Sequence, residues 1–291
     1  MAMVLSVQTG PVNNYQDCED PSPPPPGEET GLKLLHDGLA PEVDIIAVHG
    51  LGGHRENSWT AANGVNWLHG LLPGDMPNIR VLSWGYSLAT VKNSHETMSE
   101  QKISEQLVRD LWELRSSTNT TNRPIIFIAH SLGGTIVKSA LLYADSAQET
   151  PTADLRRISL STRGAIFMGT PELDSRLVGL QSYLASAKGS EQESSDIYKE
   201  AHWLMTILES YPSISQHIWT LFVHERLNSP SRNTPLGQTA SSPQDKSSHI
   251  FVQADHSGMV KFEASLDEGY LQIKEHLVYV EKILKQSTTS E

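Results

Sequence analysis

The feature that most constrains the fold is a short apolar run that ends in a serine flanked by small residues. Residues 124–129 are apolar almost throughout, which is typical of a central parallel strand covered on both faces. The run leads into Ala-His-Ser-Leu-Gly at residues 129–133 and then into a helical pattern. A tight strand-to-helix turn of this kind holds a serine hydroxyl clear of the backbone, in a strained conformation. The pattern therefore predicts a nucleophile, Ser131, at the carboxyl end of a central strand.

Small residues stand two positions before and two positions after this serine, where the strand and helix backbones pass close together. Gly133 meets this requirement, and Ala129 adds only one methyl group to the more usual glycine. A glycine-capped turn with an incidental serine has the same composition, so the pentapeptide alone leaves both interpretations open. His130, beside the serine, is expected to pack within the turn and not to act as a base.

An earlier strand, predicted at residues 43–48, ends in His-Gly-Leu-Gly-Gly. This is the position where a second oxyanion donor is expected, because the loop would face the helix that opens after Ser131. We expect the backbone amides of Leu51 and Leu132 to bind a developing oxyanion. His49 is expected to shape this loop.

A serine needs a base at neutral pH, and the base must be oriented by an acid. In this arrangement the chain order is serine, then acid, then histidine. His256 follows the last predicted strand, at residues 249–252, and precedes the terminal helix. It is therefore the predicted base, with a solvated loop histidine as the alternative among the chain's 12 histidines.

Four carboxylates between the serine and the base are candidates for the acid. Glu225 directly follows a strand predicted at residues 218–224 and is favoured. Glu172 and Asp174 follow the preceding strand and remain alternatives. Asp255 is adjacent to the base and is expected to point away from its ring. Any of these could instead be an ordinary surface carboxylate.

Residues 1–32 differ from the rest of the chain, since they contain no Lys or Arg and include a proline-rich run at 21–26. We interpret them as a disordered, acidic, proline-rich tail. The segment has neither a basic start nor a long apolar stretch, so it is not expected to be a secretory signal. No apolar run reaches the roughly 18 to 20 residues of a membrane span, and a cytoplasmic location is expected.

Residues 33–291 are expected to form one α/β domain. Short apolar runs alternate there with amphipathic stretches, which predicts a mostly parallel sheet with helices on both faces. Residues 172–215 are too long for a plain connection. They are predicted to be a helical cap insertion near the site.

Composition excludes several function classes. Lys and Arg number 22 against 34 Asp and Glu, a net charge of −12, so binding of a nucleic-acid backbone is not expected. The single cysteine, Cys18, allows no intrachain disulfide. No metal-ligand cluster and no phosphate-cradling glycine loop followed by Lys is present. We therefore expect no metal and no cofactor, and the sequence says nothing about oligomeric state.

Taken together, these motifs resemble the α/β-hydrolase superfamily. Within it, the chain is similar to lipase-like serine esterases of filamentous fungi, which stand alone or are fused to NACHT or NB-ARC ATPases. The resemblance implies Ser131 as nucleophile, His256 as base and Glu225 as acid. Residues 172–175 depart from relatives that often carry a basic residue there, which affects substrate contacts. The motifs that carry the resemblance lie at residues 48–53, 84–86, 129–134, 167–171 and 254–262.

These observations predict a serine hydrolase that cleaves a carboxylic ester of a small-molecule or lipid-like acyl substrate through an acyl-enzyme on Ser131. One alternative is an enzyme of a fungal natural-product pathway that performs hydrolysis, acyl transfer or condensation. Another is a non-catalytic signalling domain that uses the proline-rich tail for docking.

Overall fold

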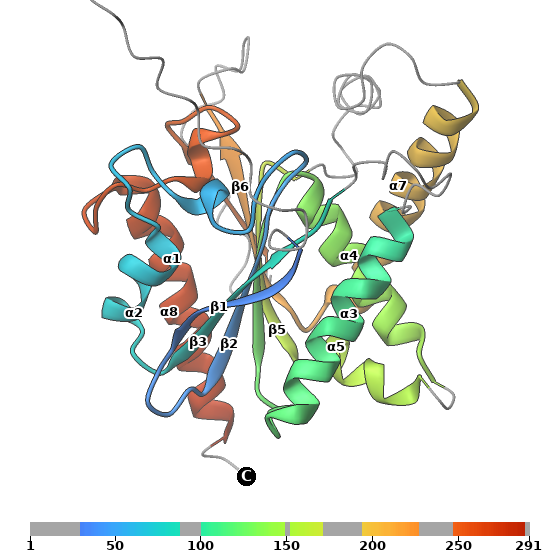
Figure 1. Ribbon diagram of the computed structural model, residues 1–291, viewed down its shortest axis with the longest axis horizontal. Coiled ribbons are helices and arrows are strands. Elements are labelled where there is room, and N and C mark those ends of the chain that lie inside the picture. The colour runs from blue at the N-terminus through green and yellow to red at the C-terminus, as the bar shows by residue number, and fades with distance from the viewer. Residues whose placement is uncertain (1–29, 88–99, 149–151, 171–193, 227–246, 289–291) are drawn as a thin grey trace, which may run out of the picture.

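The computed structural model describes residues 30–87, 100–148, 152–170, 194–226 and 247–288 (Figure 1). Seven strands form one sheet in the order β1-β3-β2-β4-β5-β6-β7. β1 pairs with β3 in the antiparallel direction, and all the other pairs are parallel. The strands are β1 (Gly31–Asp37), β2 (Val43–Val48), β3 (Ile79–Gly85), β4 (Ile125–His130), β5 (Thr162–Met168), β6 (Trp219–Glu225) and β7 (Ser247–Val252).

Helices cover both faces of this sheet (Figure 1). One face carries α3 (Glu100–Ser117), α4 (Leu132–Ser146), α5 (Arg156–Ser161) and α7 (Ser194–Ser215). The opposite face carries α1 (Trp67–Gly70), α2 (Leu72–Asp75) and α8 (Glu268–Thr288). Single 3-10 turns lie at Asn57–Trp59, Ala153–Leu155 and Gly258–Val260.

The sheet separates two hydrophobic clusters. Every residue of β2 is buried, and its side chains alternate between the clusters. Ile46 and Val48 pack toward α3 and α4, whereas Ile45 and Ala47 pack toward α8. This two-sided burial explains why the central strands are apolar at consecutive positions and show no alternation with polar residues.

The predicted fold class is confirmed, because the sheet is mostly parallel and has helices on both faces. One strand was not expected. β1 begins at Gly31, so its first two residues fall inside the predicted tail, while residues 1–29 lie outside the described part of the chain. β1 is an edge strand that exists by pairing with β3, and local sequence does not reveal such a partner.

The predicted cap is described only in its second part. Residues 194–215 form α7, whose Tyr211 is buried in the same cluster as α4. Residues 171–193 lie outside the described part of the chain, so the cap stays a prediction. In the part of the chain that is described, no helix is long and apolar enough to cross a membrane.

Candidate active site

The predicted nucleophile lies in the turn between β4 and α4. Ser131 has φ 52° and ψ −125°, a conformation that L-residues rarely adopt and that carries about 1–3 kcal/mol of strain. Asn119 is the one other non-glycine residue with positive φ in the described ranges. The Ser131 amide donates a hydrogen bond of 2.8 Å to the Met168 carbonyl at the end of β5. Backbone strain is therefore concentrated at the serine that the sequence singles out.

The turn is possible because Gly133 has no side chain. A Cβ atom there would lie 2.3 Å from the His49 carbonyl oxygen and 2.6 Å from that of Val48. Both atoms belong to backbone at the end of β2, so they cannot rotate away. The requirement for a small residue two positions after the serine thus comes from contact between the start of α4 and the end of β2, the strand beside β4 in the sheet.

The loop after β2 is held by a buried histidine. The Tyr86 amide donates to His49 Nε2 at 3.3 Å, and His49 Nδ1 donates to the Gly50 carbonyl at 2.7 Å. The imidazole also stacks on the Tyr86 ring, with 4.5 Å between ring centroids. Burial lowers the pKa of His49 to about 4. The ring is therefore neutral near pH 7, with its proton on Nδ1, and it holds the loop that carries Leu51.

Two backbone amides at this edge have no acceptor among the described residues. Leu132 is the first residue of α4, so its amide has no acceptor within the helix. Neither this amide nor that of Leu51 donates a hydrogen bond to another described residue. Both residues flank the turn at Ser131, since Gly50, next to Leu51, would meet the Ser131 Cβ at 2.9 Å if it carried a Cβ of its own.

The predicted base and the favoured acid lie side by side. His256 Nδ1 is 3.2 Å from Glu225 Oε2, and the two side chains are 42% and 34% exposed. This is ion-pair distance, although Oε2 has no partner at a hydrogen-bonding angle among the described residues. Gly169 lies against the imidazole, and a Cβ atom there would be 2.8 Å from His256 Cε1.

Asp255 is engaged elsewhere. Its Oδ1 accepts a hydrogen bond of 2.6 Å from the Gly258 amide, and its carbonyl accepts one from Met259. The carboxylate thus caps the turn after the base. The alternatives Glu172 and Asp174 lie outside the described residues.

His130 links the serine turn to the loop of the base, a contact that sequence reasoning missed. Its Nε2 donates to the His256 carbonyl at 2.8 Å, and the two rings lie 4.8 Å apart. Burial, with a smaller contribution from nearby His256, lowers the pKa of His130 to about 4. The ring is therefore a neutral donor near pH 7. The two residues are 126 positions apart, so no local pattern could have indicated the contact.

The order of elements completes the picture. The strained serine follows central strand β4, the carboxylate of Glu225 lies on the last residue of β6, and the histidine follows the last strand, β7. The fold is that of the α/β-hydrolases. In this fold the nucleophile turn and the loop after the earlier strand meet at the carboxyl edge of the sheet.

Known proteins similar to this chain share only part of its sequence. No family model matches the chain. Protein SERAC1 of Danio rerio is 29% identical over 171 residues, which cover 49% of this chain and 24% of that protein. Protein SERAC1 of Homo sapiens is 23% identical over 186 residues, which cover 58% of this chain and 28% of that protein. The matched segment thus spans about a quarter of the length of these relatives.

Solved structures of similar arrangement include hydrolytic enzymes. A structure from work on carboxylesterases of the archaeon Nitrososphaera gargenis aligns with a TM-score of 0.47 and 13% identity, covering 86% of this chain and 94% of that one. MenH from S. aureus aligns with a TM-score of 0.42 and 13% identity, covering 87% and 99%. YbtT, a type II thioesterase of the yersiniabactin pathway, aligns with a TM-score of 0.42 and 13% identity, covering 86% and 98%.

Proposed function

We propose that the chain is a serine hydrolase that cleaves a carboxylic ester through an acyl-enzyme on Ser131. The observation that carries the proposal is the strained conformation of this serine at the sheet edge where His256 and Glu225 approach within 3.2 Å. A glycine at this position would relieve the strain. A serine here instead presents a hydroxyl group at the sheet edge, as a nucleophile requires.

In the first half of the reaction, the Ser131 hydroxyl oxygen attacks the ester carbonyl carbon and His256 Nε2 takes its proton. Glu225 faces the other ring nitrogen, Nδ1, which favours the tautomer that leaves Nε2 free to accept. The carbonyl oxygen becomes negative and is bound by the amides of Leu51 and Leu132. Collapse of this intermediate breaks the ester C–O bond, and the alcohol leaves with the proton from His256.

In the second half, His256 removes a proton from water as the water attacks the acyl-enzyme. The acid product leaves, and the proton returns to the Ser131 oxygen. His256 is 42% exposed, so water can reach the ring from solvent. His130 and His49 take no part in proton transfer in this scheme, because burial holds the pKa of each at about 4. They act as fixed neutral donors that position the loop of the base and the oxyanion loop.

The deciding experiment is labelling with a fluorophosphonate, which forms a covalent bond with an activated serine. The wild type is expected to label, and Ser131→Ala is expected not to. Ser139→Ala is the matched control, because this serine is also buried and lies two turns along the same helix. A folded wild type that does not label would refute the proposal, and equal labelling of Ser131→Ala would refute the assignment of the nucleophile.

The choice of acid is tested by the turnover of p-nitrophenyl esters. Glu225→Gln is expected to reduce kcat by about 10²–10⁴-fold, because the imidazole loses the charge that orients it. Asp255→Asn, the matched control, is expected to change kcat by less than tenfold. A normal kcat in Glu225→Gln, with a large loss in Glu172→Gln or Asp174→Asn, would move the role of the acid to one of those residues.

The same acyl-enzyme could pass its acyl group to an acceptor other than water, as in the natural-product alternative. Reactivity of Ser131 with the probe, combined with no turnover of generic esters, would favour such a dedicated reaction. A non-catalytic role predicts no labelling at all. The resemblance to the fungal lipase-like type stays a prediction.

A further inference from the structure

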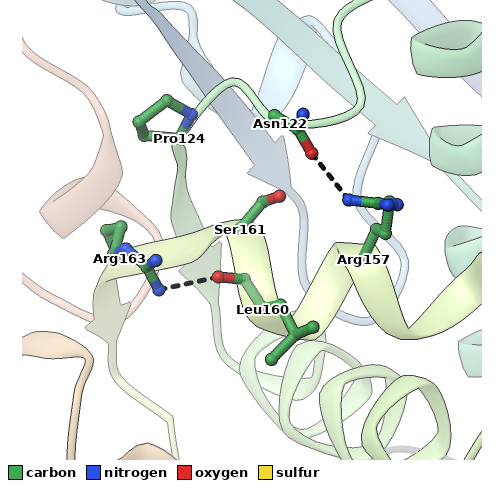
Figure 2. Close-up of a pocket in the computed structure, with 6 residues that line it drawn as sticks. All are labelled: Asn122, Pro124, Arg157, Leu160, Ser161 and Arg163. Carbon is green, nitrogen blue, oxygen red and sulfur yellow. Dashed lines mark hydrogen bonds between the residues drawn. The ribbon is translucent and has the colours of Figure 1, made fainter. Parts of the chain in front are cut away.

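A second candidate site lies at the end of the sheet opposite Ser131. A pocket of about 270 Å³ opens between the loop before β4, helix α5 and the start of β5 (Figure 2). It is therefore at the amino ends of β4 and β5, whereas Ser131 follows the carboxyl end of β4. The six residues of β4 separate the two sites by roughly 17–20 Å, at about 3.3 Å per residue. The residues that line the pocket are Asn122, Pro124, Arg157, Leu160, Ser161 and Arg163.

Among the described residues, the two arginines of this pocket donate to neutral acceptors. Arg157 Nη1 donates to Asn122 Oδ1 at 2.8 Å, and Arg163 Nη1 donates to the Leu160 carbonyl at 2.7 Å. Figure 2 shows these two arginines on either side of Ser161. No described carboxylate lies within 4.0 Å of either guanidinium. By contrast, Arg156 on the same helix is paired with Asp145 at 3.6 Å.

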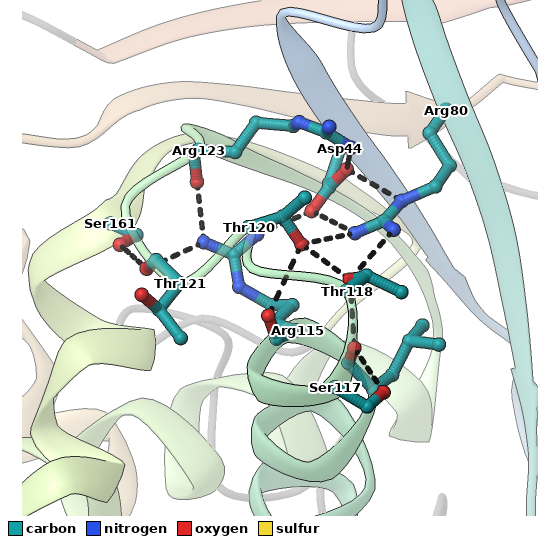
Figure 3. A network of polar contacts seen from close by, with 10 residues as sticks. Asp44, Arg80, Arg115, Ser117, Thr118, Thr120, Thr121, Arg123 and Ser161 are labelled. Carbon is teal, nitrogen blue, oxygen red and sulfur yellow. Dashed lines mark hydrogen bonds and ion pairs between the residues drawn. The ribbon is translucent and has the colours of Figure 1, made fainter.

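Further positive charge lies near Ser161 of the pocket lining (Figure 3). Arg80, Arg115 and Arg123 all bind the carboxylate of Asp44, which is fully buried. Three guanidiniums and one carboxylate sum to +2. Burial, together with the charges of Arg80 and Arg123 and against the opposing effect of Asp44, lowers the pKa of Arg115 to about 10. With three guanidiniums around one carboxylate, the group is short of negative charge.

One loop joins this cluster to the pocket. Arg115 Nη2 and the Ser161 hydroxyl both donate to the Thr121 carbonyl, each at 3.0 Å. Thr121 is adjacent to Asn122 of the pocket lining. The two arginines of the pocket and the three of the cluster carry five positive charges against the one carboxylate of Asp44, a net charge of +4. The whole chain carries −12, so this concentration of unneutralised arginine runs against the composition of the protein.

We propose that the pocket binds the phosphate group of a small phosphorylated molecule through Arg157, Arg163 and the amide of Asn122. Arginine recognises phosphate through paired N–H donors, and a dianion fits a surplus of several positive charges better than a monoanion does. Asn122 accepts from Arg157 through Oδ1, so its NH₂ group remains as a donor. The pocket volume of about 270 Å³ is slightly below the about 300–1,000 Å³ usual for ligand sites, so the phosphorylated molecule is expected to be small.

The test measures the thermal midpoint of the full chain at constant ionic strength, with chloride replaced by inorganic phosphate or by phenyl phosphate. A saturable rise of about 3 °C is expected at tenfold the Kd. Arg157→Gln and Arg163→Gln are each expected to weaken binding at least tenfold. Arg109→Gln is the matched control, because this exposed arginine of α3 pairs with Glu105 at 3.8 Å, and it should bind as the wild type does.

Three results would overturn the proposal. The first is no saturable effect of either phosphate compound. The second is an equal midpoint shift in the Arg157→Gln and Arg163→Gln variants. The third is that the protein binds neither soluble phosphate compound but sediments with phosphatidylcholine vesicles that contain phosphatidic acid, in a manner that depends on Arg157 and Arg163. That result would place the phosphate on a lipid. Since no step of the test uses ester turnover, its outcome does not depend on the proposed hydrolase activity.

Discussion

Replacing Asp44 with asparagine is expected to lower the stability of the fold substantially. Asp44 is fully buried on β2 and accepts from Arg80 Nε at 2.9 Å, from Arg80 Nη2 at 2.8 Å and from Arg123 Nη1 at 3.0 Å. It also accepts from Arg115 Nη1. Asparagine removes the negative charge and turns one acceptor oxygen into an NH₂ group that faces guanidinium donors. The buried cluster is then left with three positive charges and no carboxylate.

The magnitude follows from the burial of the partners. The side chains of Arg115, Arg80 and Arg123 are 0%, 6% and 18% exposed, so water compensates little for the lost carboxylate. Removing one partner of a buried ion pair destabilises a protein by about 3–5 kcal/mol. For a domain of this size, that corresponds to a fall in Tm on the order of 10 °C.

Urea unfolding monitored by circular dichroism measures the change in the free energy of unfolding. Asp145→Asn is the matched control: its side chain is 33% exposed and pairs with Arg156 at 3.6 Å, so a loss of less than about 1 kcal/mol is expected. If the midpoint of Asp44→Asn fell no further than that of the control, the reasoning about uncompensated guanidiniums would be wrong. A double variant with Arg115→Met should lose less stability than the sum of the single variants, because one uncompensated charge is removed with its partner.

Three further predictions concern the candidate active site. Gly169→Ala should reduce kcat for ester hydrolysis at least 100-fold, because the new methyl group would displace the His256 ring from Glu225. Alanine at the Gly169 φ of 59° costs only about 1–2 kcal/mol of stability, so the variant should still fold. A kcat near the wild-type value would contradict this prediction. His130→Phe keeps an aromatic ring but removes the donor to the His256 carbonyl. Labelling of Ser131 by the fluorophosphonate should therefore slow about tenfold or more. An unchanged labelling rate would show that the hydrogen bond from His130 to the loop of His256 is only structural. The free energy of unfolding should fall as the pH drops from about 6.5 to about 4, because His49 and His130 have pKa values lowered to about 4 in the folded protein and take up protons on unfolding. Each histidine contributes at most about 1.4 kcal/mol per pH unit. Urea midpoints that do not change over this pH range would refute the sign of the effect.

Elements that depend on neighbouring residues were predictable from the sequence. The apolar run before Ser131 and the glycine after it predicted a strand, a tight turn and a helix, and β4 and α4 have this arrangement. These features follow from side-chain periodicity and from the few residue types that fit a tight turn, so a local window of sequence contains the information.

Other features depend on partners that are distant in sequence. β1 is a strand because β3 offers it a free edge, and the Asp44 cluster collects arginines 36, 71 and 79 positions away. Candidates for the acid could be placed only at strand ends, and it is the register of β6 beside β7 that brings Glu225 next to the loop of His256.

The sequence by itself determined the class of fold and the position of the strained serine. Hydrophobic periodicity and the requirement for small residues in a tight turn act over a few positions of the chain. Three features are visible only in the folded chain: the approach of Glu225 to His256, the link that His130 makes between the two loops, and the place where the surplus of arginine gathers. Charge and hydrogen bonding act between atoms a few ångströms apart in space, and only folding brings those atoms together.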